Sequence, residues 1–117
     1  MELIEKQIVF SQLLAKFIIE LTAKGYGVTG GEWYRSEETC ELYAKMGKGI
    51  KNSLHTLRIA VDLNLFRNGR FLRLSEEYKQ AGEIWEHYST QDFNCAWGGR
   101  FLKPDGNHFS IVHAGIR

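Results

Sequence analysis

Two short segments, far apart in the chain, carry residue types that could bind a metal ion and move a proton. The first contains His55 and Asp62, and the second contains Asp105 and His108. Two imidazoles and one carboxylate that leave a fourth coordination position open are a ligand set of zinc hydrolases. A further carboxylate that does not bind the ion could take a proton from the attacking water. The residue types therefore indicate a Zn²⁺ site with His55, Asp62 and His108 as ligands and Asp105 as the catalytic base.

The spacing of His55 and Asp62 requires a bend in the chain between them. Seven residues span about 10 Å along a helix, at about 1.5 Å per residue. Along a straight strand they span roughly 23 Å, and the two side chains point to opposite faces. Bonds to zinc are only about 2 Å long, so neither element alone brings both donors easily to one ion. We therefore expect His55 on a loop and Asp62 on the strand that follows.

The alternation of apolar and polar residues predicts the strands that would carry two of these ligands. In residues 59–66 every second residue is apolar, and Asp62 lies on the opposite face. Residues 103–106 are typical of a turn, with Pro at the second position and Gly at the fourth. A strand over residues 108–112 is expected next, with His108 on its polar face. If both strands belong to one sheet, Asp62 and His108 can share its polar face.

The residues above resemble the pattern of a known family, the zinc D,D-carboxypeptidases and L-alanyl-D-glutamate endopeptidases. That pattern is Ser-x-His, six residues and Asp, followed much later by Asp or Glu, two residues and His. In this chain it falls on Ser53, His55, Asp62, Asp105 and His108. Members of the family include bacterial wall-trimming peptidases, the dipeptidases of glycopeptide resistance and many phage endolysins. The resemblance extends over about residues 27–113 and implies a zinc peptidase.

Two further segments extend the resemblance. Residues 97–99, Trp-Gly-Gly, match a segment of the family, and residues 33–36 are similar to its Gly-Tyr-Arg-Ser/Thr segment, whose Arg faces the substrate. The resemblance thus implies that Arg35 stabilises the developing oxyanion; a surface salt bridge is the alternative. Ser53 could bind substrate, orient the first imidazole or be an ordinary loop serine. Trp97 could form a wall of the substrate cleft or pack in the core beside a turn.

One position departs from the family pattern. Arg58 stands three residues after His55, where the family often has Gly. A Gly there would allow a positive φ or a close backbone approach. Arg58 could alter the loop or add a positive charge near the cleft, which bears on substrate preference more than on metal binding.

Helical periodicity and capping residues predict three helices. Apolar residues at helical spacing predict the first helix over residues 2–23. Ser36 is expected to cap a second helix that ends near Gly47, because Ser is a favoured N-cap. Ser75 is expected to cap a third helix over residues 76–88 in the same way.

The remaining pattern predicts a small sheet around these helices. Residues 27–35 are expected to be extended, a loop is expected over residues 48–57, and Asn68-Gly69 is typical of a type I′ hairpin turn. Three helices with a small, mostly antiparallel sheet give an α+β fold. The resemblance implies that this fold is hedgehog/DD-peptidase-like.

Length and composition fit one small globular domain over residues 1–117. The net charge of +1 gives no reason to expect nucleic acid as a partner, and no stretch reaches the ~20 apolar residues of a membrane span. The acidic N-terminus does not look like a signal peptide, so we expect synthesis and folding in the cytoplasm. Cys40 and Cys95 are expected to be reduced.

The function implied by the resemblance is hydrolysis of an amide bond in the peptide stem of bacterial peptidoglycan. A phage or prophage endolysin, an L-alanyl-D-glutamate endopeptidase, is the first expectation, acting as a monomer at the cell wall after release from the cytoplasm. A D-alanyl-D-alanine carboxypeptidase would use the same ligands. A non-catalytic zinc-containing binding module on the same fold, and a tail-associated phage component that cleaves peptidoglycan during entry, are the further alternatives.

Overall fold

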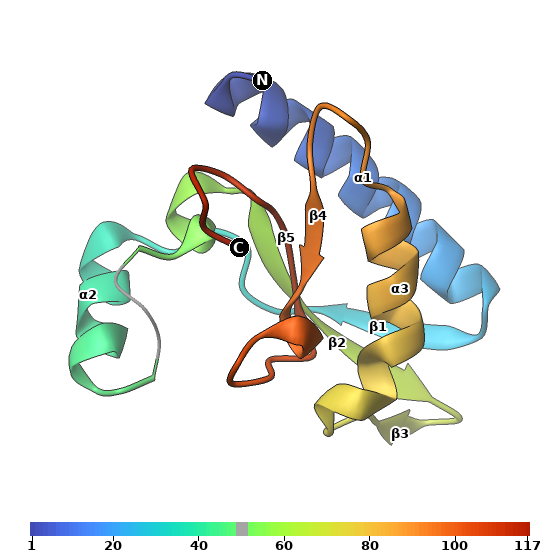
Figure 1. The fold of residues 1–117 in the computed structure, drawn as a ribbon. Coiled ribbons are helices and arrows are strands. Elements are labelled where there is room, and N and C mark those ends of the chain that lie inside the picture. Colours follow the sequence, from blue (N-terminus) through green and yellow to red (C-terminus); the bar gives the residue numbers. More distant parts are fainter. Residues whose placement is uncertain (49–51) are drawn as a thin grey trace.

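The computed structural model describes residues 1–48 and 52–117 and has an α+β fold (Figure 1). The predicted fold class is confirmed, because the described residues form three α-helices and one antiparallel sheet. No helix of the described part of the chain is long and apolar enough to cross a membrane. The elements in chain order are α1 (Leu3–Ala23), β1 (Tyr26–Gly30), α2 (Glu37–Lys45), β2 (Ala60–Arg67), β3 (Arg70–Phe71), α3 (Lys79–His87), β4 (Cys95–Trp97) and β5 (His108–Ile111).

The sheet places the predicted polar faces of β2 and β5 side by side. Its strand order is β1-β2-β5-β4, with the short β3 paired to β2, and every pairing is antiparallel. Within the β2–β5 ladder, Asp62 is the direct partner of His108. Paired residues point to the same face of a sheet. The prediction that these two side chains share one face is therefore confirmed.

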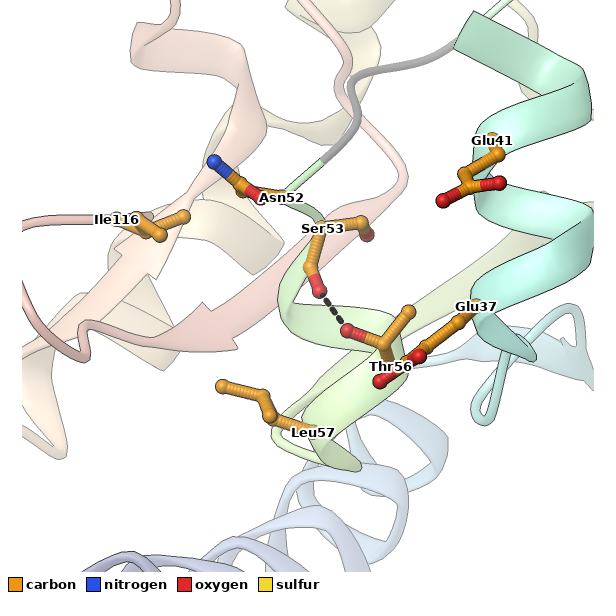
Figure 2. A pocket seen from close by; sticks show the side chains of 7 residues that line it. All are labelled: Glu37, Glu41, Asn52, Ser53, Thr56, Leu57 and Ile116. Carbon is orange, nitrogen blue, oxygen red and sulfur yellow. Dashed lines mark hydrogen bonds between the residues drawn. The ribbon is translucent and has the colours of Figure 1, made fainter.

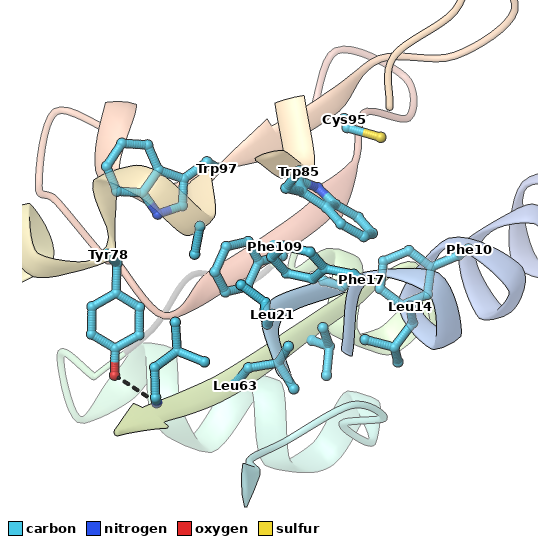
Figure 3. Packing of buried hydrophobic residues seen from close by; sticks show 14 of the residues in the cluster. Phe10, Leu14, Phe17, Leu21, Leu63, Tyr78, Trp85, Cys95, Trp97 and Phe109 are labelled. Atoms are coloured by element: carbon cyan, nitrogen blue, oxygen red, sulfur yellow. Dashed lines mark hydrogen bonds between the residues drawn. The ribbon is translucent and has the colours of Figure 1, made fainter. Parts of the chain in front are cut away.

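The core lies on the opposite face of the sheet, where α1 and α3 pack. Helix α1 buries one stripe of apolar residues, and Phe17 of this stripe lies with its ring centroid 4.9 Å from that of Phe109 on β5 and 5.1 Å from that of Trp85 on α3 (Figure 3). Burial of such a side chain stabilises the fold by roughly 1.5–3 kcal/mol relative to exposure. This packing holds β5, and therefore His108, against the helices. The buried stripe consists of Phe10, Leu14, Phe17 and Leu21.

The second helix and the hairpin agree with their predictions. The Ser36 hydroxyl accepts a hydrogen bond from the Thr39 N–H at 3.1 Å, so Ser36 caps α2 as expected. Asn68 and Gly69 both have positive φ, 53° and 75°, as a type I′ turn requires. The predicted loop over residues 48–57 includes residues 49–51, which lie outside the described residues. Its end forms a short 3-10 helix, Leu54–Leu57.

The third helix begins later than predicted, and Ser75 is not its cap. Residues Ser75–Tyr78 form a 3-10 helix, and α3 starts at Lys79. The Ser75 hydroxyl instead accepts the Gly106 N–H at 2.9 Å, while the Glu77 carboxylate accepts the Leu74 N–H at 3.1 Å. A hydrogen bond to a distant loop has therefore replaced the local capping bond that the sequence suggested.

The turn before β5 also differs from the prediction. Its hydrogen bond runs from the His108 N–H to the Asp105 carbonyl at 3.1 Å, so the turn spans Asp105 to His108 rather than residues 103–106. Asp is favoured at the first position of such turns. The shift of two residues puts Asp105 and His108 at the two ends of a single turn.

Candidate active site

The three predicted ligands meet on the polar side of the sheet. His55, Asp62 and His108 each offer one ligand atom, and these atoms all lie within 4.8 Å of one another. Asp62 Oδ1 is 3.4 Å from His55 Nε2 and 3.8 Å from His108 Nδ1. Asp62 Oδ1 is buried without a hydrogen-bond partner among residues 1–48 and 52–117. A buried acceptor without a partner is costly, and a bound cation would satisfy it, so these three residues fit a metal ion.

The 3-10 helix Leu54–Leu57 fixes the orientation of His55. The Ser53 hydroxyl accepts the His55 N–H at 3.1 Å and so caps this short helix. The ring Nδ1 of His55 lies 3.0 Å from the Trp33 carbonyl oxygen. A carbonyl can only accept, so Nδ1 carries the proton and Nε2 presents its lone pair toward Asp62. Such an outer hydrogen bond fixes the tautomer that a metal ligand needs.

Arg58 ends the 3-10 helix with a left-handed backbone conformation. Its φ of 60° and ψ of 30° explain why Gly often occupies this position in the family pattern. Its carbonyl accepts the Trp33 Nε1–H at 3.2 Å, and its guanidinium lies 4.0 Å from the centroid of the Tyr34 ring. The arginine therefore keeps the loop geometry that a glycine would allow and places its charge against Tyr34.

His108 is a neutral imidazole at neutral pH in this site. The residue is 6% exposed. Burial, and secondly the nearby His55, lower its pKa to about 4, while the Asp62 charge opposes the shift. Metal ligands must be deprotonated to bind, so the environment of His108 favours the form that can coordinate a cation.

Asp105 lies close enough to the cluster for its carboxyl group to interact with it electrostatically. Partial burial of the carboxyl group raises its pKa most and the Asp62 charge raises it further, whereas His55 and Arg35 lower it. Taken as a whole, Asp105 is an exposed residue. Its carboxylate has no hydrogen bond or ion pair with any described residue. A carboxylate with a raised pKa beside a metal site is suited to proton transfer.

The Trp-Gly-Gly segment holds the loop that carries Asp105. The Asp105 N–H donates to the Gly98 carbonyl at 2.9 Å, and a Cβ on Gly98 would lie 2.1 Å from the Asp105 carbonyl oxygen. Trp97 is 4% exposed, and its Nε1–H donates to the Gly106 carbonyl at 2.7 Å. Trp97 thus packs in the core beside a turn, and a contact of Trp97 with substrate stays a prediction.

Arg35 lies beside the cluster with its charge already paired. Its Nε donates to the Glu32 carboxylate, its guanidinium lies 5.1 Å from the centroid of the Tyr43 ring, and its side chain is 12% exposed. The Arg35 charge lowers the pKa of both Asp105 and His108, which places it within electrostatic reach of them. The pair is therefore a half-buried ion pair at the site, not one on the open surface.

Glu32 is a site residue that sequence reasoning missed. Its carbonyl accepts the Asp62 N–H at 2.8 Å, and its carboxylate pairs with Arg35. It thus extends the pairing beyond β1 and orients two candidate site residues at once. The only signal for Glu32 in the sequence is that it stands three residues before Arg35, and such a spacing of opposite charges is common on protein surfaces.

Ser53 also lines a pocket. This pocket of about 320 Å³ lies between α2 and the 3-10 helix and is lined in part by Glu37 and Glu41 (Figure 2). The Ser53 carbonyl accepts the Thr56 hydroxyl at 2.6 Å there, while the Ser53 hydroxyl holds the His55 N–H. The bond to the His55 N–H is consistent with a role of Ser53 in orienting His55, and the roles of Ser53 stay predictions.

Comparisons with known proteins identify one family model and a similar solved structure. The model of a family described as D-alanyl-D-alanine carboxypeptidase matches residues 46–111. The crystal structure of the L-Ala D-Glu endopeptidase ChiX of Serratia marcescens is similar with a TM-score of 0.61 and 19% sequence identity, over 87% of this chain and 79% of that chain. At this identity the similarity shows the fold. The search of curated proteins found no match.

Proposed function

The chain belongs to the D-alanyl-D-alanine carboxypeptidase family, and we propose that it is a zinc peptidase that hydrolyses an amide bond in the peptide stem of bacterial peptidoglycan. The predicted family and the predicted enzyme class, a peptidase, are confirmed by this membership and by the fold. The observation that carries the proposal is the cluster of His55, Asp62 and His108 with the carboxylate of Asp105 beside it.

Two imidazoles and one carboxylate suit zinc better than a hard cation such as Mg²⁺ or Ca²⁺. The same set leaves a coordination position for water or substrate, as catalytic zinc sites do. When bound, the ion supplies Lewis acidity that makes the attacking water more acidic and polarises the substrate carbonyl. The Trp33 carbonyl keeps the His55 imidazole in the tautomer that this binding needs.

Asp105 is the proton carrier in the proposed reaction. Its carboxylate accepts the proton of the attacking water and later delivers it to the nitrogen of the leaving amine. This carboxylate is available for both transfers, because it has no hydrogen bond or ion pair with any described residue. The Gly98 and Trp97 contacts hold the loop of Asp105 in place during these two transfers.

Arg35 supplies positive charge for the oxyanion that develops on the substrate carbonyl. Its pairing with Glu32 holds the guanidinium beside the cluster. Ser53 orients the first ligand through its hydrogen bond with the His55 main chain. We also propose that Ser53 and Trp97 contact the substrate.

For the bond that is cut we propose the amide between L-alanine and D-glutamate. The solved structure with the similar fold is described as an L-Ala D-Glu endopeptidase, whereas the family description names a D-alanyl-D-alanine carboxypeptidase, which is the second candidate. We further propose that residues 1–117 act as one monomeric domain of a phage or prophage endolysin, made in the cytoplasm and acting at the cell wall.

Digestion of purified peptidoglycan, with and without a chelator, tests this proposal. Mass spectrometry should find new N-terminal D-glutamate, which disappears with the chelator and returns when zinc is added. Release of D-alanine instead would assign the carboxypeptidase reaction. Tightly bound zinc without any cleavage would contradict the catalytic proposal and favour the binding-module alternative.

A further inference from the structure

We propose that Arg73 binds the carboxylate of the substrate residue whose amine leaves, and that the pocket beside Asp105 is the subsite for this residue. The inference rests on the proposed function, because it assigns a substrate group to a pocket next to the same site. It concerns the part of the substrate that follows the scissile bond.

The pocket lies next to the proposed proton carrier. It has a volume of about 250 Å³ and a largely polar lining. Asp105 stands at one side of it, and Arg73, from the chain just after β3, stands among its other lining residues. Its polar lining includes Asn64, Arg73, Ser75, Asp105 and Asn107.

This pocket continues the polar face of the sheet away from the cluster. Asn64 follows Asp62 by two residues on β2, so both side chains point to the same face. Asn107 directly precedes His108, and its Nδ2 donates to Asn64 Oδ1 at 3.3 Å. A peptide held at the cluster therefore meets the two asparagines and the pocket as its chain continues along this face.

Arg73 is the positive charge of this pocket, and its guanidinium has no acceptor among the described residues. The neighbouring acid is already engaged: Glu77 Oε2 pairs with Arg70 at 2.7 Å, and Glu77 Oε1 accepts the Arg73 main-chain N–H at 3.2 Å. The Ser75 hydroxyl holds the Gly106 N–H. The exposed Arg73 guanidinium is thus available for an anion from outside the protein.

The proposed reaction supplies such an anion at this place. Asp105 gives its proton to the leaving amine, so the substrate residue that carries this amine lies on the Asp105 side of the site. In both candidate bonds that residue, D-glutamate or D-alanine, bears a free carboxylate on the same carbon as the amine. Arginine binds a carboxylate through two parallel hydrogen bonds. One side chain would thus recognise the feature that the two substrates share.

A pair of synthetic peptides tests the assignment. The two peptides contain the bond that the peptidoglycan digest identifies and differ only in the carboxylate, which is replaced by a carboxamide in the second peptide. Zinc-loaded wild-type protein should prefer the carboxylate peptide by about 10- to 100-fold in kcat/KM, the factor expected for a hydrogen bond to a charged group. Arg73→Gln should remove this preference by slowing the carboxylate peptide alone, and Arg73→Lys should keep part of it.

Arg67→Gln is the matched control, because it removes the same charge from the end of β2 at a residue that neither lines the pocket nor pairs with Glu77; its guanidinium donates to Gln80 Oε1 at 3.4 Å. It should keep the preference, and both variants should keep their zinc. Calorimetry of the amine product should show weaker binding to Arg73→Gln by a similar factor.

Equal effects of Arg73→Gln on both peptides, or no effect on either, would overturn the inference while the peptidase proposal stands. Failure of the wild-type protein to cleave either peptide or peptidoglycan would overturn the peptidase proposal, and this inference with it.

Discussion

Asp62 and His108 are direct partners in the antiparallel ladder of β2 and β5, although a long stretch of chain with a hairpin and a helix separates them. Their side chains lie on one face because the two strands are in this register. A slip of one residue would move one of them to the core face. The proposed metal site is therefore a direct consequence of strand pairing.

Removal of one ligand should abolish metal binding. We expect His108→Ala to lower the zinc affinity by more than the ~10- to 100-fold that is typical for loss of an outer-shell partner, because only two of the three ligands remain. His87→Ala is the control, since His87 is exposed on α3 and its Nδ1 lies 3.1 Å from the Glu83 carbonyl oxygen. Zinc content after dialysis, with circular dichroism to verify the fold, measures the effect. Full zinc occupancy in His108→Ala would exclude His108 as a ligand.

Replacement of the proton carrier should separate binding from catalysis. We expect Asp105→Asn to keep zinc and to reduce kcat by about 10²- to 10⁴-fold, the usual contribution of acid–base catalysis. Asp105→Glu should recover part of the rate, because the proton-accepting group is retained. Rates on the peptidoglycan peptide and zinc content are measured together. Wild-type turnover by Asp105→Asn would remove Asp105 from its proposed role.

Substitution at Gly98 should displace the Asp105 loop and press on His108, because an added Cβ would also lie 2.8 Å from the His108 Cβ. A Cβ at this position would lie 2.1 Å from the Asp105 carbonyl oxygen, so the loop must shift. We expect Gly98→Ala to destabilise the fold by about 1–3 kcal/mol, the range for overpacking, and to lower the rate. Gly30→Ala is the control, because no atom lies within 4 Å of its added Cβ. Chemical denaturation compares the two, and equal stabilities would contradict the close approach at Gly98.

The left-handed conformation of Arg58 predicts an order of stabilities. Both Arg58→Gly and Arg58→Ala lose the contact with the Tyr34 ring, but only Gly adopts a φ of 60° without steric cost. In the left-handed conformation a residue with a Cβ is destabilised by roughly 1–2 kcal/mol. We therefore expect Arg58→Gly to be the more stable variant by about 1 kcal/mol. Thermal and urea unfolding measure the difference. A more stable Arg58→Ala would mean that the loop changes its backbone conformation.

The thiol of Cys95 should be unreactive in the folded protein. Burial raises its pKa to about 12, against a small opposing effect of Ser89. The folded state holds this proton more tightly than the unfolded state, so stability should fall as the pH rises above about 8.5, the ordinary cysteine value. At pH 8 a maleimide should label Cys95 only after unfolding, with the site assigned by peptide mass. Rapid labelling of the native protein would contradict the burial of this side chain.

The sequence predicted the features that rest on local periodicity and local turns. The alternation around Asp62 and the Asn68-Gly69 pair were enough to predict β2 and its hairpin, because burial of one face and the need for positive φ act on neighbouring residues. The shared face of Asp62 and His108 followed from two such strands once they were assumed to pair.

Features set by tertiary contacts were not predictable in the same way. The Ser75 hydroxyl satisfies the Gly106 N–H instead of capping a helix, and the turn before β5 begins at Asp105 because the strand ladder fixes His108. Glu32 carries no motif at all, and only the fold brings it to Asp62 and Arg35. Each of these contacts joins residues whose proximity depends on the complete sheet.

The partner of the His55 ring is a main-chain carbonyl, that of Trp33, and the Arg35 N–H returns a bond to the His55 carbonyl at 3.2 Å. Neither bond depends on which side chain stands at position 33 or 35. The side chain at position 33 can therefore change, from a glycine in the family pattern to a bulky tryptophan here, while the main-chain partner of the imidazole is kept. A change of side chain next to the site therefore need not change the reaction that the site catalyses.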